Sequence, residues 1–282
     1  MVRCLNLGCG SRYVQGWANL DFVATKDVIG HDLRKPLPFA DGEFDIVYHS
    51  HVLEHFSKID ATRFLRECWR VLKPGGLCRI AVPDLEGIAT FYLREVDSLR
   101  RGGGSRSSNH EWMLLELYDQ VVRTQPGGAM VEFLERETLE NEDFVTFRLG
   151  IEAKRIIERS RRQRVDRSVV KNTRLGIKSG IKRLAQRWRM AGAAMLAGIP
   201  VAALHAAKFR ETGENHLCMY DEFALRNILS ETGFVDMQRQ DAKSSAISEW
   251  AAFALDTEPD GTTYKPDSLF MEARRPQRTA SG

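Results

Sequence analysis

The sequence lacks the patterns that mark secreted or zinc-stabilised proteins. No C-x-x-C pair occurs among its five cysteines, and no charged leader with an apolar stretch precedes the first predicted strand. We therefore expect free thiols in a reducing compartment, with neither a disulfide framework nor a structural zinc site. No signal peptide is expected, and a cytoplasmic location is predicted. The cysteines are Cys4, Cys9, Cys68, Cys78 and Cys218.

The composition is that of a globular protein whose charge is unevenly distributed. The chain has 282 residues, of which 43% are hydrophobic and 28% are charged. This length and composition fit one large domain, or a core with an insertion, around a sizeable hydrophobic core. The net charge is only +3, yet residues 148–189 hold fifteen Lys or Arg and three acids, while residues 130–143 are acidic. The positive charge is therefore local.

The stretch at residues 2–10 (VRCLNLGCG) predicts a buried strand that ends in a glycine loop. Gly8 and Gly10 can adopt positive φ angles, and they leave the backbone bare for a small ligand. A second short strand at residues 18–22 carries Asp21 near its end. An acid at that place hydrogen-bonds ribose hydroxyls in nucleoside-binding α/β folds.

The rest of the chain alternates strand and helix patterns. An amphipathic helix is predicted over residues 59–72, with Ile59 on its buried face and residues 73–76 (KPGG) as its stop. Such alternation favours a parallel, doubly wound sheet. A helix over residues 219–233 precedes two more strands, the last of which we expect to be antiparallel. The other predicted strands cover residues 27–33, 44–48, 77–82, 234–240 and 268–274.

The chain resembles a class I S-adenosylmethionine-dependent methyltransferase, of the group called methyltransferase type 11 or UbiE-like. The resemblance covers about residues 2–90 and is carried by LNLGCG, NLD, DLRKPLPFADGEFDIVYHSHVLEHF, FLRECWRVLKPGG and RIAVPD. It implies S-adenosyl-L-methionine as the cofactor. It also implies an α/β fold, in which a Rossmann-like, seven-stranded, mostly parallel sheet has helices on both faces and a helical insertion after the fifth strand.

The resemblance also assigns cofactor contacts. Gly8 and Gly10 would approach the methionine part of the cofactor, and Asp21 would bind its ribose. Residues 32–33 would flank the adenine, and residues 49–50 would line the cofactor side of the substrate cleft. The predicted cofactor-binding residues are Asn6, Gly8, Cys9, Gly10, Asp21, Asp32, Leu33, His49 and Ser50.

Two positions depart from the family pattern. Asn6 stands where an acid is usual, and Arg12 stands where a third glycine is frequent. Because an amide both donates and accepts hydrogen bonds, Asn6 remains compatible with cofactor binding. The short stretch at residues 11–17 predicts an unusual cofactor lid.

Three side chains are candidates for catalysis: His51, His55 and Asp84. Methyl transfer to a hydroxyl is an in-line displacement in which the enzyme aligns the partners and a base removes the proton. An imidazole suits that role. The alternative for both histidines is a structural role in packing, capping or backbone hydrogen bonding. The histidines and Glu54 are metal-compatible, but their spacing does not match H-E-x-x-H, and no metal site is predicted.

The middle of the chain predicts an insertion into the core. We expect a first core part over residues 1–100, a helical cap over 101–213, a second core part over 214–275 and a tail over 276–282. A glycine-rich hinge at 102–105 would lead into the cap, where a helix at 112–122 would cover the cofactor cleft.

Three interpretations of the basic run stay open. It is a solvated face of the cap, a surface for anionic membranes, or a nucleic-acid surface. The segment Lys178 to Ala207 is basic and amphipathic, and then apolar, which favours peripheral contact with the inner face of a membrane. Because no array of stacking aromatic residues accompanies the basic run, nucleic acid is the least favoured partner.

We therefore expect a methyltransferase that acts on a hydroxyl of a sugar, glycan or other small acceptor. This acceptor rests on analogy with relatives. A methyltransferase for a lipid or quinone precursor at a membrane surface is one alternative. A non-catalytic module that binds S-adenosylmethionine and docks on RNA or protein is another. The oligomeric state is open.

Overall fold

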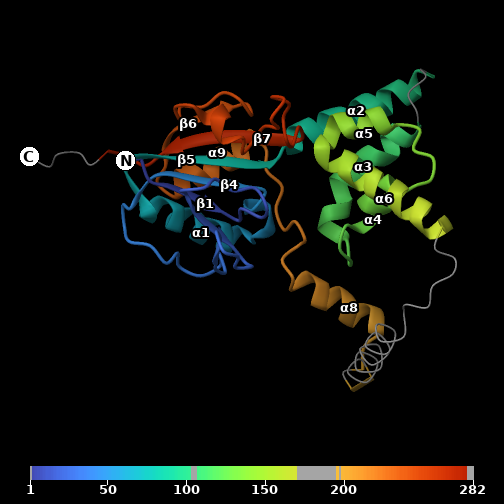
Figure 1. Ribbon diagram of the computed structural model, residues 1–282, viewed down its shortest axis with the longest axis horizontal. Coiled ribbons are helices and arrows are strands. Elements are labelled where there is room, and N and C mark those ends of the chain that lie inside the picture. Colours follow the sequence, from blue (N-terminus) through green and yellow to red (C-terminus); the bar gives the residue numbers. More distant parts are fainter. Residues whose placement is uncertain (1, 103–106, 170–194, 197, 278–282) are drawn as a thin grey trace, which may run out of the picture.

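The computed structural model describes residues 2–102, 107–169, 195–196 and 198–277. Most of the predicted basic amphipathic segment, residues 178–194, lies outside the described residues, as do 103–105 of the predicted hinge and 278–282 of the predicted tail. The strands and the helical cap occupy opposite ends of the molecule, and the first and last described residues, 2 and 277, lie at the sheet end (Figure 1).

Seven strands form a single sheet in the order β3-β2-β1-β4-β5-β7-β6. All neighbours are parallel except β7, which runs antiparallel to both β5 and β6. This confirms the predicted α/β fold with a mostly parallel sheet and an antiparallel strand at the end of the chain. The strands are β1 (Cys4–Leu7), β2 (Ala18–Asp21), β3 (Ile29–Gly30), β4 (Phe44–Ser50), β5 (Leu72–Pro83), β6 (Val235–Gln240) and β7 (Ser268–Arg274).

Helices α1 (Lys58–Val71) and α9 (Glu222–Glu231) cover one face of the sheet. Ser57 caps α1 by accepting a hydrogen bond from the backbone N–H of Asp60. The buried stripe of α1 contains Phe64, Leu65 and Cys68. The expected burial of Ile59 is wrong, because this residue lies on the opposite side of the helix and is 68% exposed.

The transition from α1 to β5 also differs from the prediction. The helix ends at Val71 and the strand begins at the next residue, so residues 73–76 belong to the strand. Leu72 pairs with Phe44, and the N–H of Gly75 donates to the carbonyl of Arg275. Because of these long-range backbone contacts, residues 73–76 (KPGG) form an irregular part of β5 and not a separate turn after the helix.

The other face of the sheet is covered by an irregular segment, residues 241–267, where the sequence predicts helices on both faces. Its regular part is the short 3-10 helix η2 (Trp250–Phe253). Arg79, fully buried on β5, holds this segment through ion pairs of 2.8 Å with Asp256 and with Glu272 of β7. The guanidinium also donates to the carbonyls of Asp241 and Ser244. On this face an irregular segment therefore takes the place of a helix, and the buried contacts of Arg79 hold that segment against the sheet.

The cap is a helical group that follows β5. It comprises α2 (Leu85–Arg100), α3 (Ser107–Val122), α4 (Gly128–Leu134), α5 (Glu142–Leu149) and α6 (Ile151–Val169). These helices enclose a second apolar cluster around Trp112 and Phe133. A buried ion pair between Arg148 and Glu116, 2.6 Å apart, joins α5 to α3. The division into core parts and cap, with its boundaries, remains a proposal.

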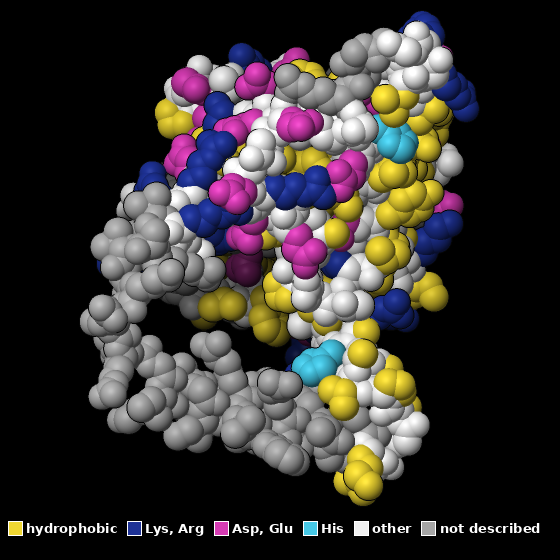
Figure 2. Space-filling view, turned by 90° about the vertical axis from the view of Figure 1, so that its right-hand side faces the viewer, with side chains coloured by type: hydrophobic (Ala, Val, Ile, Leu, Met, Phe, Trp, Pro, Cys, Tyr) yellow, Lys and Arg dark blue, Asp and Glu magenta, His cyan; other side chains and the backbone are white. Residues whose placement is uncertain are grey.

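Acidic and basic side chains are interspersed on the surface of this helical group (Figure 2). Arg159 and Arg161 on α6 pair with Glu135 and Glu142, and Arg162 pairs with Glu158 on the same helix. Exposed pairs of this kind contribute little to stability but reduce the local positive potential. In the described part of the basic run, residues 148–169, several arginines are thus exposed to solvent and paired with nearby glutamates.

Helix α8 (Val201–Arg210) lies apart from both ends of the molecule and leads back towards the sheet (Figure 1). Among the described helices, none combines the length and the apolar character that crossing a membrane requires. The chain after α8, residues 210–217, runs along the sheet edge and brings insertion residues to the cavities described next.

Candidate functional site

Three cavities meet at the carboxyl ends of β1, β2 and β4, the edge where parallel α/β sheets bind ligands. Their volumes are about 240 Å³ over the glycine loop, about 670 Å³ beside β2, and about 270 Å³ against the helical cap. We call them the loop cavity, the β2 cavity and the cap cavity. His51, with a φ of 53°, borders all three.

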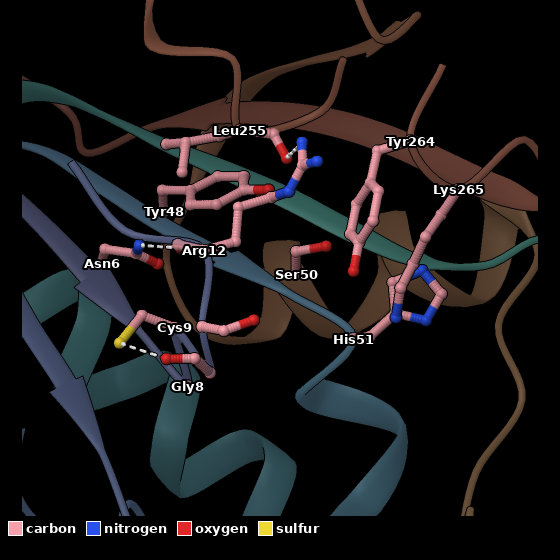
Figure 3. Close-up of a pocket in the computed structure, with 12 residues that line it drawn as sticks. Asn6, Gly8, Cys9, Arg12, Tyr48, Ser50, His51, Leu255, Tyr264 and Lys265 are labelled. Atoms are coloured by element: carbon pink, nitrogen blue, oxygen red, sulfur yellow. Dashed lines mark hydrogen bonds between the residues drawn. The ribbon is translucent and has the colours of Figure 1, made fainter. Parts of the chain in front are cut away.

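The loop cavity is built on the glycine loop after β1. Gly8 and Gly10 have φ angles of 66° and 54°, which favour glycine. A Cβ on Gly8 would meet Cγ2 of Val52 at 2.4 Å, so the backbone approaches its neighbour closely there. Figure 3 shows Tyr264, Lys265 and His51 together on one side of this cavity, with Asn6 and Cys9 on the opposite side.

Arg12 ties the short lid region to the segment that covers the far face of the sheet. Its guanidinium lies over the Tyr264 ring, 3.7 Å from the centroid, and donates to the carbonyls of Ala254 and Thr257. It also pairs with Glu258. Arg12, which stands in place of a glycine, thus joins the short stretch at residues 11–17 to the loop at residues 254–264, and the unusual cofactor lid stays a prediction.

The β2 cavity collects the predicted ribose and adenine contacts. Asp21, Asp32 and Leu33 line it, and the backbone of Gly10 donates a 2.7 Å hydrogen bond to Asp21. Arg34 forms a side-chain hydrogen bond to Asp32 and lowers the pKa of that carboxyl, although burial opposes the shift. Asp32 therefore presents carboxylate oxygens, which accept hydrogen bonds from hydroxyl groups, and Oδ2 of Asp21 already accepts one from the loop backbone.

Two predicted site residues lie elsewhere. His49 is fully buried and packs edge-on against the Phe64 ring, 5.1 Å between centroids. Successive side chains of a strand point to opposite faces, so Tyr48 and Ser50 face the loop cavity and His49 faces α1. Asp84 forms a 3.0 Å ion pair with Arg239 and lines none of the three cavities. Its carboxylate is paired with Arg239 at the start of α2, and a catalytic role for Asp84 stays a prediction.

The cap cavity contains a buried carboxylate surrounded by imidazoles. Glu54 is fully buried, and its Oε1 lies 3.3 Å from Nδ1 of His51, 3.9 Å from Nε2 of His55 and 4.0 Å from Nε2 of His216. Burial raises the pKa of Glu54, but hydrogen bonding to His51 and the electrostatic attraction of that imidazole outweigh it, and the pKa is lowered to about 2. Glu54 is therefore ionised at neutral pH.

The two further histidines are neutral at the same pH. Burial lowers the pKa of His55, against the opposing charge of Glu54. Burial likewise lowers the pKa of His216 to about 3. His55 donates from Nδ1 to the carbonyl of Asn215 at 3.2 Å, because a carbonyl can only accept. This leaves Nε2 of His55 as an unprotonated nitrogen on the side of Glu54.

Sequence reasoning missed the residues that reach the site from the end of the insertion and from the last loop. His216 lies about 160 positions after His55, and Tyr264 and Lys265 follow still later. No local motif surrounds them. The expectation that the helix at 112–122 covers the cofactor cleft is wrong, because α3 adds Gln120 to the cap cavity alone.

Comparisons with known proteins identify part of the chain. Residues 15–80 match a protein family described as a methyltransferase domain. Over 84 residues the chain is 37% identical to the uncharacterized protein YafE of Escherichia coli K12. This alignment covers 28% of this chain and 39% of YafE. Over 56 residues it is 38% identical to a probable S-adenosylmethionine-dependent methyltransferase of Mycolicibacterium smegmatis. This alignment covers 20% of this chain and 21% of the relative.

A solved structure of a SAM-dependent methyltransferase from Archaeoglobus fulgidus aligns with 97% of this chain and 86% of its own chain, at 12% identity and a TM-score of 0.38. The chain spans less than half the length of the two curated relatives.

The part of the chain that these comparisons identify is residues 15–80, which match a methyltransferase domain, as the motifs of this stretch indicate. The match agrees with the predicted enzyme class and with S-adenosylmethionine as the expected cofactor. The residues present fit that cofactor, because Gly10 has open space where a side chain would stand and two carboxylates line the adjoining β2 cavity.

Proposed function

We propose that the protein transfers a methyl group to a hydroxyl of a small acceptor, such as a sugar, bound in the cap cavity. The observation that carries the proposal is that His51 borders the loop, β2 and cap cavities at once. A group at this junction touches both the cofactor cleft and the acceptor space. S-adenosylmethionine, when bound, supplies an electrophilic methyl on a sulfonium.

The loop and β2 cavities are assigned to the cofactor. Asn6, Gly8, Cys9 and Gly10, with Ser50, would hold its methionine part in the loop cavity. In the β2 cavity, Asp21 would accept hydrogen bonds from the ribose hydroxyls, while Asp32 and Leu33 would flank the base. Both cavities include Gly8, which makes them two parts of one cleft.

His51 is the proposed proton acceptor. Its Nε2 lies 2.8 Å from the Ser268 hydroxyl, and its Nδ1 faces Oε1 of Glu54. A carboxylate behind an imidazole holds the ring and stabilises the imidazolium that forms when Nε2 takes a proton. His55 uses Nδ1 to bind a backbone carbonyl, which suits a positioning role better than proton transfer.

The membrane alternative draws on Lys178 to Ala207, most of which lies outside the described residues. Four exposed large apolar side chains, Met195, Leu196, Ile199 and Val201, lie in the described part of that segment. Exposed apolar residues alone do not favour a membrane-surface substrate over a small acceptor, because membrane binding also needs the basic face of such a helix.

Calorimetry with S-adenosylmethionine tests the cofactor assignment. We expect saturable binding to the full chain and at least about tenfold weaker binding to Asp21→Ala, since the ribose hydroxyls lose a charged acceptor. Asp27→Ala removes an exposed acid from the loop after β2 and serves as the control. Unchanged binding to Asp21→Ala would reject the ribose contact.

Release of S-adenosylhomocysteine in the presence of a panel of monosaccharides, disaccharides and small diols tests the reaction. We expect His51→Gln to keep cofactor binding and to lose turnover by about 100-fold or more, because a positioned proton acceptor is removed. Binding without turnover on the whole panel would instead favour the non-catalytic module.

A further inference from the structure

Three potential metal ligands from two distant segments converge in the cap cavity. Glu54 and His55 follow β4, and His216 comes from the chain between α8 and α9. One ligand atom from each of the three residues lies within 4.8 Å of the others. The loop cavity adjoins this cluster through His51.

The carboxylate at the centre of the cluster is buried and meets only imidazoles. Glu54 has no exposed surface, and among the described residues the only groups within ion-pair distance of its oxygens are imidazole nitrogens, of which Nδ1 of His51 at 3.3 Å is the nearest. A carboxyl group removed from water in this way is costly unless a cation or further hydrogen bonds compensate it. The arrangement therefore calls for a positive group beside Glu54.

Protein cations do not supply that charge. Arg123 and Lys265 both line the cap cavity. Arg123 donates to the carbonyl of Glu214, and Lys265 lies 4.0 Å from Glu152. Across the described ranges, no Lys or Arg comes within ion-pair distance of Glu54. Only imidazoles do so.

The imidazole of His55 presents a lone pair to the carboxylate. The ring of His55 is fixed by its Nδ1–H bond to Asn215, so its Nε2 lone pair faces an anionic oxygen 3.9 Å away. A metal-binding histidine has this same arrangement, with one nitrogen bonded to a carbonyl and the other free for the metal. His216 is 3% exposed, and Nε2 is likewise its nitrogen on the Glu54 side.

We propose that Glu54, His55 and His216 bind a divalent transition-metal ion. Two of the three separations are 3.9 and 4.0 Å and all lie within 4.8 Å, so a point equidistant from the three atoms lies about 2.3–2.5 Å from each, slightly longer than the bonds of such ions. Two imidazoles and one carboxylate suit Zn²⁺, Fe²⁺, Mn²⁺ or Co²⁺ better than Ca²⁺ or Mg²⁺, which prefer oxygen ligands. A carboxylate offers about four lone pairs, so Glu54 can bind the ion and still face His51.

Three protein ligands leave coordination positions open, and the cap cavity lies beside them. Its lining includes Gln120, Arg123 and Asp267, all within a space of about 270 Å³. An ion held there offers its open positions to an oxygen of the acceptor and orients it towards the cofactor cleft. This role rests on the proposed function, whereas the binding site itself does not.

Cobalt titration of the full chain tests the site. The protein is treated with EDTA, dialysed and titrated with Co²⁺ while visible absorption is recorded, and Zn²⁺ is then added as competitor. We expect one Co²⁺ per chain, a d–d band that Zn²⁺ abolishes, and affinity about 100-fold or more lower in Glu54→Gln and His216→Ala. His205→Ala, which removes an exposed histidine on α8, is the matched control and should bind as the wild type does.

Two results would overturn the proposal: no saturable Co²⁺ binding up to millimolar concentration, or equal binding by wild type and Glu54→Gln. Glu54→Gln retains the shape of the side chain, and its melting temperature shows whether it is folded. S-adenosylmethionine affinity is measured on the same samples. Cobalt binding without cofactor binding would reject the proposed function and leave the metal site standing.

Discussion

The guanidinium of Arg12 stacks on the ring of Tyr264, although the two residues are separated by most of the chain. The contact closes the loop cavity from the side where the family often has a third glycine. Its bonds to two carbonyls of residues 254–257 hold the loop that covers the far face of the sheet. One side chain thus links the loop after β1 to the loop at residues 254–264.

Replacement of Arg12 by alanine should loosen this loop. We expect a loss of about 2–4 kcal/mol in the free energy of unfolding, since a stacked guanidinium and its charged hydrogen bonds are removed together. Cofactor affinity should fall about tenfold. Urea denaturation and calorimetry measure the two effects.

Arg12→Lys is the matched variant. It keeps the charge but loses the planar fork that bonds two carbonyls and stacks on a ring, so an intermediate effect is expected. If Arg12→Ala were as stable as the wild type, the clamp would have no energetic role.

Gly8→Ala should destabilise the protein more than Gly10→Ala. Both residues have positive φ, which costs an alanine about 1–2 kcal/mol. Only at Gly8 would the added Cβ meet Val52, at 2.4 Å, and overpacking of this kind costs a further 1–3 kcal/mol or so. Urea denaturation of the two variants compares them, and equal losses would contradict the close approach at Gly8.

Cys9 should resist alkylation at mildly alkaline pH. Burial and the negative charge of Asp21 raise the pKa of its thiol to about 11. A raised pKa keeps the thiol protonated below that value, and only the thiolate attacks iodoacetamide. Labelling of the folded protein should therefore be slow at pH 8 and should accelerate as the pH approaches 11.

Peptide mapping by mass spectrometry follows Cys9 separately from the other thiols. The urea-unfolded chain at pH 8 is the control, in which Cys9 should react at the rate of an ordinary cysteine. Equal rates for folded and unfolded chains at pH 8 would reject the raised pKa.

Local patterns were sufficient for the sheet and for much of the cofactor cleft. A short apolar run before Gly8-Cys9-Gly10 predicts β1 and its loop, and Asp21 lies beside that loop, where it accepts a bond from the N–H of Gly10. The assignment of cofactor contacts remains a prediction, since geometry alone does not show a bound ligand.

Two predicted site residues, His49 and Asp84, line none of the three cavities, and the structure gives a reason for each. His49 sits in the correct strand, but alternation along β4 turns it to the α1 face between two residues that face the cavity. Asp84 lies at the expected strand exit, yet Arg239 from β6 pairs with it. Neither outcome is visible in a local window, because the partner or the facing element comes from elsewhere in the chain.

The sequence by itself was sufficient to predict the match to a methyltransferase domain over residues 15–80 and the mostly parallel sheet, because these depend on short runs of neighbouring residues and on the alternation of strand and helix. Only the tertiary structure decided what surrounds Glu54. His216 reaches that carboxylate only because the chain returns to the sheet edge after the insertion. The proposed metal site depends on this return, since it places a second imidazole beside Glu54 and His55. Burial and long-range contact are properties of the folded chain, and no spacing in the sequence encodes them.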